Sequence, residues 1–337
     1  MAAALGPTLR IATRGSALAR WQAEEVSRLL RAANPACQVE LVVVDTVGDR
    51  RQDVPVWEMG GQGVFVKEVQ TAVIEGRADL AVHSAKDLPS APAPGLILAA
   101  LPCRADPRDA VVGVSLADLG AGAVVATGSV RRRAQLASLR PDLTFTGLRG
   151  NIATRLERVP AGGAVIVALA ALQRLGLADR ATEILDPTVM LPQVGQGAIA
   201  VECRADDPDT AAALATIDDR AVHVAVAAER GFLAHLGGGC DLPVGAYARF
   251  GVDGGPLVVE GLMASLDGRV VLRSFSAGDM PGPGAGGASG PNWPGDFDVS
   301  AALAAAADLG TRLAQDLLAA GGADLLDIGV GVGDAGS

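Results

Sequence analysis

The sequence predicts an α/β protein in which two α/β lobes are followed by a smaller α+β domain. From residue 9 to about residue 200, short apolar runs alternate with amphipathic stretches, which is typical of βαβ units with largely parallel sheets. After residue 240 the pattern changes to strand-like runs separated by Gly-Asp-type turns. Half of the 337 residues are apolar and only 3% are aromatic, so small aliphatic side chains can fill more than one core.

In the first part of the chain, the expected strands are short and apolar. They cover residues 9–13, 39–44, 79–82, 124–126, 144–146 and 164–168. Ser16 can cap a helix that carries Leu18, Trp21 and Val26 on one face. A polar, Gly-rich segment at 47–63 precedes a second helix at about 67–75.

The last part of the chain predicts a three-stranded antiparallel meander and one helix. Its expected strands are residues 244–250, 257–265 and 270–276. Ser300 can cap an Ala/Leu-rich helix over residues 300–320. Between them, residues 278–295 form a Gly/Pro run with almost no apolar content, which indicates a surface insertion.

Composition excludes several classes of protein. The net charge of −10 argues against a surface that binds nucleic acid or anionic membrane as a whole. No stretch is long and apolar enough to cross a bilayer, and residues 1–14 lack a secretory signal, so we expect a cytoplasmic protein. The four cysteines form no CxxC pair and the three histidines show no ligand spacing, so reduced thiols and no metal site are expected.

Basic residues are nevertheless concentrated in one part of the chain. Seven arginines lie close together: Arg131, Arg132, Arg133, Arg140, Arg149, Arg155 and Arg158. The chain has only two lysines, Lys67 and Lys86. A pocket for a small polyanion and a solvated, Arg-rich helix face both explain this cluster, and charge alone does not separate them.

Four polar loops lie where an expected strand gives way to a helix. They are residues 13–16, 83–87, 127–132 and 148–155. In open α/β sheets, ligands bind beyond the carboxyl ends of the strands, where helix N-termini and the Arg fork both suit anions. Three of the loops combine a hydroxyl with an arginine, as Ser16 with Arg14 and Ser129 with Arg131 illustrate. A ligand with several carboxylates or phosphates is therefore expected, although a Ser or Thr before a helix is often only a cap.

Two further residues carry candidate chemistry. Asp87 follows Lys86 in the second loop, which fits either a surface ion pair or a carboxylate that handles protons in a cleft. Cys240 follows three glycines, so bulky neighbours do not shield its thiol, and it can be a reactive or modified group.

Taken in order, these loops resemble the porphobilinogen deaminase family over residues 10–318. The matching motifs include RIATRGSALA from Arg10, GVFVKE from Gly63, HSAKDLP from His83, GSVRR from Gly128, RGN from Arg149, GQGA from Gly195 and GGCDLP from Gly238.

The resemblance implies an enzyme, hydroxymethylbilane synthase, with a dipyrromethane cofactor held by Cys240 through a thioether. It implies that four porphobilinogen units are joined with loss of ammonia, and that water then releases hydroxymethylbilane. Asp87 would be the main catalytic residue, stabilising the cation left by ammonia and moving protons. Cofactor and substrate carboxylates would be bound by Arg14, Ser16, Lys86, Ser129, Arg131, Arg132, Arg149 and Arg155. No metal is implied.

The resemblance also implies two lobes of the type II periplasmic-binding fold with mixed sheets and the site between them. The expected divisions are residues 1–103 with 200–222, residues 104–199, and a C-terminal domain at 223–337 that carries Cys240. A monomer that hands its product to uroporphyrinogen-III synthase is expected. Gln62 stands where many members have Lys, and residues 47–61 are a candidate lid.

Two alternative functions remain open at this point. A non-enzymatic anion-binding protein of the same fold would explain the loops, but not Asp87 together with a Gly-flanked thiol. Nucleic-acid binding through residues 131–158 is disfavoured by the net charge and the few aromatic residues.

Overall fold

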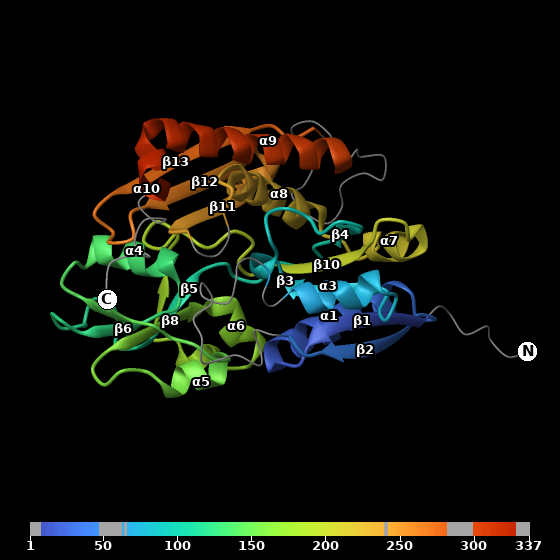
Figure 1. Ribbon diagram of the computed structural model, residues 1–337, viewed down its shortest axis with the longest axis horizontal. Coiled ribbons are helices and arrows are strands. Elements are labelled where there is room, and N and C mark those ends of the chain that lie inside the picture. Colours follow the sequence, from blue (N-terminus) through green and yellow to red (C-terminus); the bar gives the residue numbers. More distant parts are fainter. Residues whose placement is uncertain (1–7, 47–62, 64–65, 239–241, 282–298, 328–337) are drawn as a thin grey trace, which may run out of the picture. The chain divides into compact units, whose positions relative to one another are not determined.

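The computed structural model describes residues 8–46, 63, 66–238, 242–281 and 299–327 (Figure 1). The chain divides into two compact units. The first unit comprises residues 1–105 and 197–223, and the second comprises residues 106–196 and 224–337. The finer division into two lobes and a C-terminal domain stays a prediction.

The first unit is built on a five-stranded mixed sheet of order β2-β1-β3-β10-β4. Its strands are β1 (Thr8–Arg14), β2 (Gln38–Val44), β3 (Leu80–Ser84), β4 (Leu96–Ala100) and β10 (Ile199–Arg204). β1 runs parallel to β2 and β3, whereas β10 runs antiparallel to β3 and β4. The carboxyl ends of β1 and β3 therefore lie at the same edge of the sheet.

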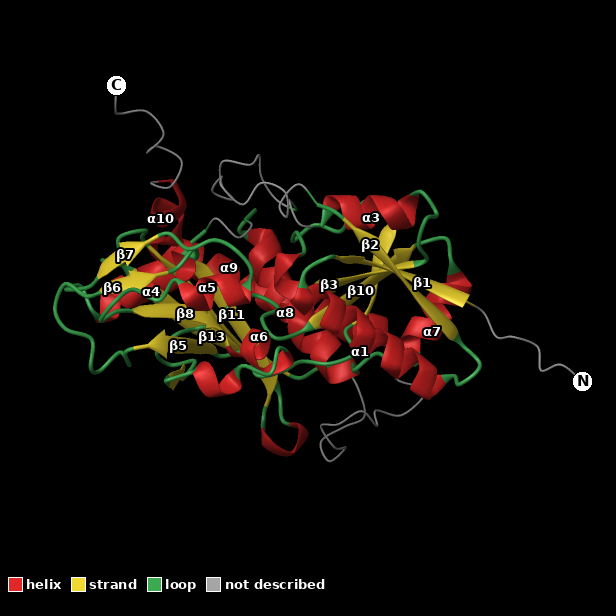
Figure 2. Cartoon of the chain, turned by 90° about the horizontal axis from the view of Figure 1, so that it is seen from below, coloured by secondary structure: helices red, strands yellow, loops and turns green. Residues whose placement is uncertain are grey.

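Helices cover both faces of this sheet. They are α1 (Ala17–Ala33), α3 (Lys67–Ile74), the short η2 (Ala85–Asp87) and α7 (Pro208–Ala215). Figure 2 shows α3 on one face and α1 with α7 on the other. Side chains alternate between the faces, so Ile11 and Leu80 pack with α1 while Ala12 and Ala81 pack with α3.

The second unit contains another five-stranded mixed sheet, of order β7-β6-β8-β5-β9. Its strands are β5 (Asp109–Gly113), β6 (Val124–Ala126), β7 (Thr144–Thr146), β8 (Ala164–Ala168) and β9 (Glu183–Leu185). Its helices are α4 (Val130–Leu139), α5 (Ile152–Glu157), α6 (Leu169–Arg174) and η3 (Ala178–Arg180). β6 is parallel to β7 and β8, and β5 is antiparallel to β8 and β9.

The same unit includes the antiparallel sheet β11-β12-β13. The other elements of this unit are β11 (Val244–Phe250), η4 (Val252–Gly254), β12 (Leu257–Ala264), β13 (Val271–Gly278), α9 (Val299–Leu317), η5 (Leu318–Gly322) and α10 (Ala323–Asp327). The helix α8 (Arg220–His235) belongs to it from residue 224 on. α9 lies along β12 and β13 (Figure 1). Phe232, Val259 and Leu313 meet in its core.

The expected fold class is confirmed: the chain has two mixed α/β sheets and a three-stranded antiparallel sheet. One expected bound differs from the structure, since Gly278, the first residue of the Gly/Pro run at 278–295, is still in β13 and pairs with Leu257. The interpretation of this run as an insertion stays a prediction. Residues 282–295 and the candidate lid at 47–61 lie outside the described residues.

The helices α8 and α9 approach most closely at Gly310. A Cβ added there would collide with the carbonyl oxygen of Ala228. We therefore expect Gly310→Ala to lower the free energy of unfolding by about 1–3 kcal/mol, since an extra methyl group in a packed core must displace its neighbours. Urea denaturation would measure this change. Gly120→Ala, where a Cβ would meet nothing within 4 Å, is the matched control, and equal stability of the two variants would contradict this packing.

Candidate functional site

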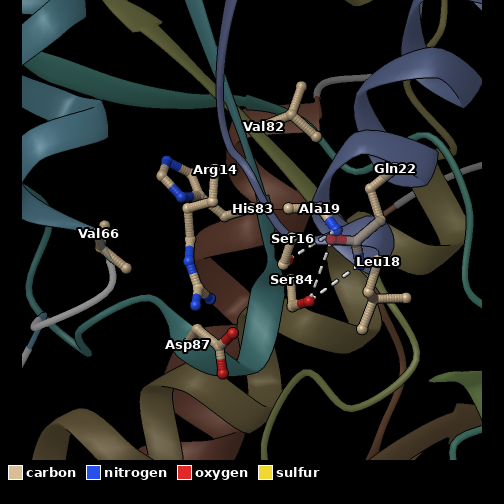
Figure 3. Close-up of a pocket in the computed structure, with 10 residues that line it drawn as sticks. All are labelled: Arg14, Ser16, Leu18, Ala19, Gln22, Val66, Val82, His83, Ser84 and Asp87. Carbon is tan, nitrogen blue, oxygen red and sulfur yellow. Dashed lines mark hydrogen bonds between the residues drawn. The ribbon is translucent and has the colours of Figure 1, made fainter. Parts of the chain in front are cut away.

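A hollow that is partly open to solvent lies at the carboxyl ends of β1 and β3 (Figure 3). We call it the Asp87 hollow. Its lining residues are Arg14, Ser16, Leu18, Ala19, Gln22, Val66, Val82, His83, Ser84 and Asp87. Two of the four loops singled out in the sequence, 13–16 and 83–87, therefore meet at one place.

Local structure explains why these side chains converge. Ser16 is the N-cap of α1, and its Oγ accepts a hydrogen bond from the Ala19 amide at 3.3 Å. Gln22, one turn further along α1, donates from Nε2 to the Ser84 Oγ at 2.9 Å. This bond ties the start of α1 to the end of β3. The turn η2 follows β3 immediately and places Asp87 beside the hollow.

Asp87 and Arg14 are the charged groups of the Asp87 hollow among the described residues that line it. The guanidinium of Arg14 points toward the carboxylate of Asp87 (Figure 3). Both side chains are half-buried, so each remains accessible to a ligand. The guanidinium can bind an anion, while the carboxylate can accept a proton or stabilise a nearby positive charge. Lys86 is half-buried in η2 next to Asp87 but does not line the hollow.

Two residues to which the sequence analysis assigned no role also line the Asp87 hollow. Gln22 is buried on α1 and His83 is buried on β3. For His83, a polar residue directly after the apolar run 80–82 of an expected strand was the available signal. For Gln22 the signal was a polar residue on the apolar face of the helix capped by Ser16.

A second cluster of predicted residues lies in the second unit, around α4. Ser129 caps this helix, since its Oγ accepts from the Arg132 amide at 3.4 Å. Arg131 and Arg132 are buried, with 2% and 5% of their surface exposed. Both bind the fully buried Asp109. The Nη2 of Arg131 lies 2.7 Å from its Oδ2, and the Nη2 of Arg132 lies 2.7 Å from its Oδ1. The interpretation of these two arginines as a solvated helix face is therefore wrong.

The charges of this cluster do not cancel. Two guanidiniums face one carboxylate, and the Gln196 amide also donates to Asp109 at 2.9 Å. Burial would raise the pKa of Asp109, but the Arg131 and Arg132 guanidiniums outweigh it and hold the pKa far below its ordinary value. Burial lowers the pKa of Arg131. The Nε of Arg131 is buried and has no hydrogen-bond partner among the described residues.

Arg149 and Arg155 lie on the neighbouring loop and on α5. Asn151 caps α5 through the Thr154 amide at 3.0 Å, and Arg155 Nε donates to the Gly150 carbonyl at 2.8 Å. Burial lowers the pKa of the half-buried Arg149. A Cβ at Gly128 would lie 2.6 Å from the Leu148 carbonyl oxygen, so the Ser129 and Arg149 loops lie against each other. The structure thus groups Ser129, Arg131, Arg132, Arg149 and Arg155 in one unit.

Cys240 and Gln62 lie outside the described residues. The described cysteines, Cys37, Cys103 and Cys203, form no disulfide with one another. Within the described part of the chain, no group of His, Cys, Asp or Glu side chains could hold a metal ion. No helix among the described residues has the length and apolar character needed to span a membrane.

Comparisons with known proteins place these features in a family. Residues 9–212 match the family model described as "Porphobilinogen deaminase, dipyromethane cofactor binding domain", and residues 223–283 match "Porphobilinogen deaminase, C-terminal domain". A porphobilinogen deaminase of Acidothermus cellulolyticus is 48% identical over 334 residues, covering 96% of this chain and 92% of the relative. One of Roseiflexus castenholzii is 45% identical, covering 95% of this chain and 98% of the relative. Among solved structures, the methionine-binding protein MetQ is similar at 13% identity and a TM-score of 0.39, covering 62% of this chain and 88% of that protein.

Proposed function

The chain belongs to the porphobilinogen deaminase family, and we propose that it joins porphobilinogen units head to tail with loss of ammonia. It is a transferase with a dipyrromethane cofactor. In our proposal the cofactor is attached to Cys240 by a thioether, four units are added in turn, and water releases hydroxymethylbilane. The observation that carries the proposal is the presence of Arg14 and Asp87 in the lining of one hollow, within residues matched by the cofactor-binding model.

The residues present suit a ligand that carries carboxylates. The Arg131 Nε is a buried donor with no partner among the described residues, and the Asp109 carboxylate neutralises only one of the two neighbouring guanidiniums. We assign carboxylate binding to Ser129, Arg131, Arg132, Arg149 and Arg155 of the second unit. In the first unit we assign it to Arg14, Ser16 and Lys86. When bound, the dipyrromethane would supply the primer from which the chain of pyrroles grows.

In this proposal Asp87 is the catalytic residue that stabilises the cation and transfers protons. When ammonia leaves porphobilinogen with the electrons of its C–N bond, a positive charge spreads over the remaining pyrrole. A carboxylate held in a half-buried hollow stabilises that charge more strongly than water does, because its surroundings are less polarisable than water and already oriented. The same oxygens can take the proton that the new carbon–carbon junction must lose to restore the aromatic ring.

A test of cofactor attachment uses the intact mass of the purified protein. We expect the unsubstituted chain to be heavier than its sequence by one two-pyrrole unit and to give the colour reaction of pyrroles with an acidic aldehyde. Cys240→Ser should lose both signals, because an alcohol is a far weaker nucleophile than a thiolate. Cys103→Ser, at a half-buried cysteine outside the proposed attachment site, is the matched control and should keep both.

The same measurement separates the enzyme from a non-enzymatic anion-binding protein of the same fold. An unmodified Cys240 in protein that nevertheless binds oligocarboxylates would favour the binding protein. A monomeric state, a cytoplasmic location and transfer of the product to a uroporphyrinogen-III synthase stay predictions. Sedimentation of the purified chain would test the first of them.

A further inference from the structure

A buried polar network lies directly behind the Asp87 hollow. His83, which lines the hollow, places its Nε2 3.2 Å from Oε2 of Glu202, and these two side chains are only 3% and 4% exposed. Gln70 donates from Nε2 to both oxygens of Glu202, at 3.1 Å and 2.9 Å. Only His83 of the three belongs to the lining shown in Figure 3.

The sheet places these residues together. β3 and β10 pair antiparallel with Ala200 opposite His83, so Glu202 lies on the same face two residues further along β10. The helix α3 covers this face with Val69, Ala72 and Val73, and Gln70 comes from the same helix. A carboxylate among apolar side chains is costly unless it is paired and hydrogen-bonded. Here Gln70 donates the hydrogen bonds, and the His83 ring lies at ion-pair distance.

The surroundings of Glu202 favour one tautomer of the His83 imidazole. An ionised carboxylate only accepts hydrogen bonds, and the Gln70 amide donates to both of its oxygens. Nε2 of His83 makes no hydrogen bond with the described residues, but a lone pair on it would be repelled by Oε2 at 3.2 Å, so we expect Nε2 to carry the hydrogen. Nδ1 is then the ring nitrogen that carries the lone pair.

We propose that Glu202 is a positioning residue of the Asp87 hollow, which acts through His83 by fixing the tautomer and the direction of its imidazole. The proposal rests on the proposed function, since the hollow is taken as the place of reaction. Porphobilinogen condensation moves protons at nitrogen and at carbon. An imidazole of one fixed tautomer always presents the same donor and the same acceptor to the reacting groups, whereas a ring that changes tautomer does not. Gln70 supports Glu202 in the same way that Glu202 supports His83.

Nuclear magnetic resonance of the imidazole nitrogens tests the first step without any assay of activity. The chain has only three histidines, so ¹⁵N-histidine labelling gives three rings that can be assigned by single substitutions. We expect His83 to carry its hydrogen on Nε2. His223, whose Nδ1 lies 3.0 Å from Asp218, should show the opposite tautomer and serves as the internal reference. A neutral His83 protonated on Nδ1 overturns the proposal, and this measurement requires no variant to fold.

Glu202→Gln tests whether the tautomer matters to the reaction. We expect the His83 nitrogen signals to change while those of His223 do not. We also expect kcat for porphobilinogen to fall on the order of ten- to a hundredfold, as it does when metal-bound histidines lose the carboxylate that orients them, with KM changed much less. Glu260→Gln, a carboxylate paired with Arg249 and Arg273 in the second unit, is the matched control and should leave both unchanged.

The outcomes separate the two proposals. An inactive unsubstituted chain with the expected His83 tautomer contradicts the proposed function and leaves the Glu202–His83 geometry supported. An active chain in which Glu202→Gln changes neither the His83 signals nor kcat overturns the positioning role. Partial recovery of kcat in Glu202→Asp, which keeps the charge on a shorter side chain, would support an electrostatic hold on His83.

Discussion

Asp87→Asn is expected to lower kcat for porphobilinogen by about a thousandfold or more, while the protein keeps its fold. Asparagine has nearly the same shape as aspartate, but it carries no negative charge and cannot exchange protons. The half-buried carboxylate beside Arg14 is thus replaced by a neutral amide, and the cation left by ammonia loses its stabilising charge. Single-turnover kinetics would measure the loss in the chemical step, and Asp87→Ala should behave in the same way.

Circular dichroism and urea denaturation would show that the Asp87 variants remain folded. Asp179→Asn in η3, an exposed aspartate outside the Asp87 hollow, is the matched control and should retain full activity. Activity of Asp87→Asn within tenfold of the unsubstituted enzyme would remove Asp87 from the mechanism.

The fold was predictable where local pattern determines structure. The strands at 9–13 and 39–44 and the helix capped by Ser16 appear with nearly the expected bounds as β1, β2 and α1. The strands β5 and β10 were not expected. Both are almost continuously buried, so they show no alternation of apolar and polar residues. Their place in the sheets depends on pairing with β8 and β3, distant in sequence, which no local pattern encodes.

The candidate site was predictable in part for a similar reason. Arg14 and Asp87 lie at or just after the carboxyl ends of two strands that pair in parallel. Their places after expected strands therefore predicted that they lie at the same edge of the sheet. The partners of the buried charges were not predictable. Asp109 begins an apolar run and Glu202 lies inside one, and neither sequence neighbourhood indicates the arginines or the histidine that face it. The assignment of Arg131 and Arg132 as carboxylate ligands stays a prediction, now with Asp109 as a competing partner.

Asp109→Asn is expected to lower the free energy of unfolding by about 3–5 kcal/mol at neutral pH, the usual cost of removing one partner from a buried ion pair. Asparagine still fits between Arg131 and Arg132, but its NH₂ group cannot accept their hydrogen bonds and two guanidiniums remain buried without a counter-charge. Urea denaturation at pH 7 would measure the difference. Asp142→Asn, which removes the partner of Arg140 at an exposed site, is the matched control and should cost far less.

The difference in stability between the unsubstituted chain and Asp109→Asn should also depend on pH. Because the pKa of Asp109 is held far below its ordinary value in the folded state, its stabilisation is complete above the unfolded pKa of about 3.9 and is lost as the pH falls toward the folded pKa. The stability difference between the unsubstituted chain and Asp109→Asn should therefore be constant from pH 7 to about pH 5 and shrink below about pH 4. A difference that stays constant below pH 4 would mean that Asp109 has its ordinary pKa in the folded state. A difference that grows as the pH falls from 7 to 5 would mean that its pKa is raised, and either result would show that the two arginines do not hold it ionised. In the proposed anion site, the buried guanidiniums of Arg131 and Arg132 keep their positions because the Asp109 carboxylate balances part of their charge. This titration therefore also tests whether Asp109 is ionised beside that site.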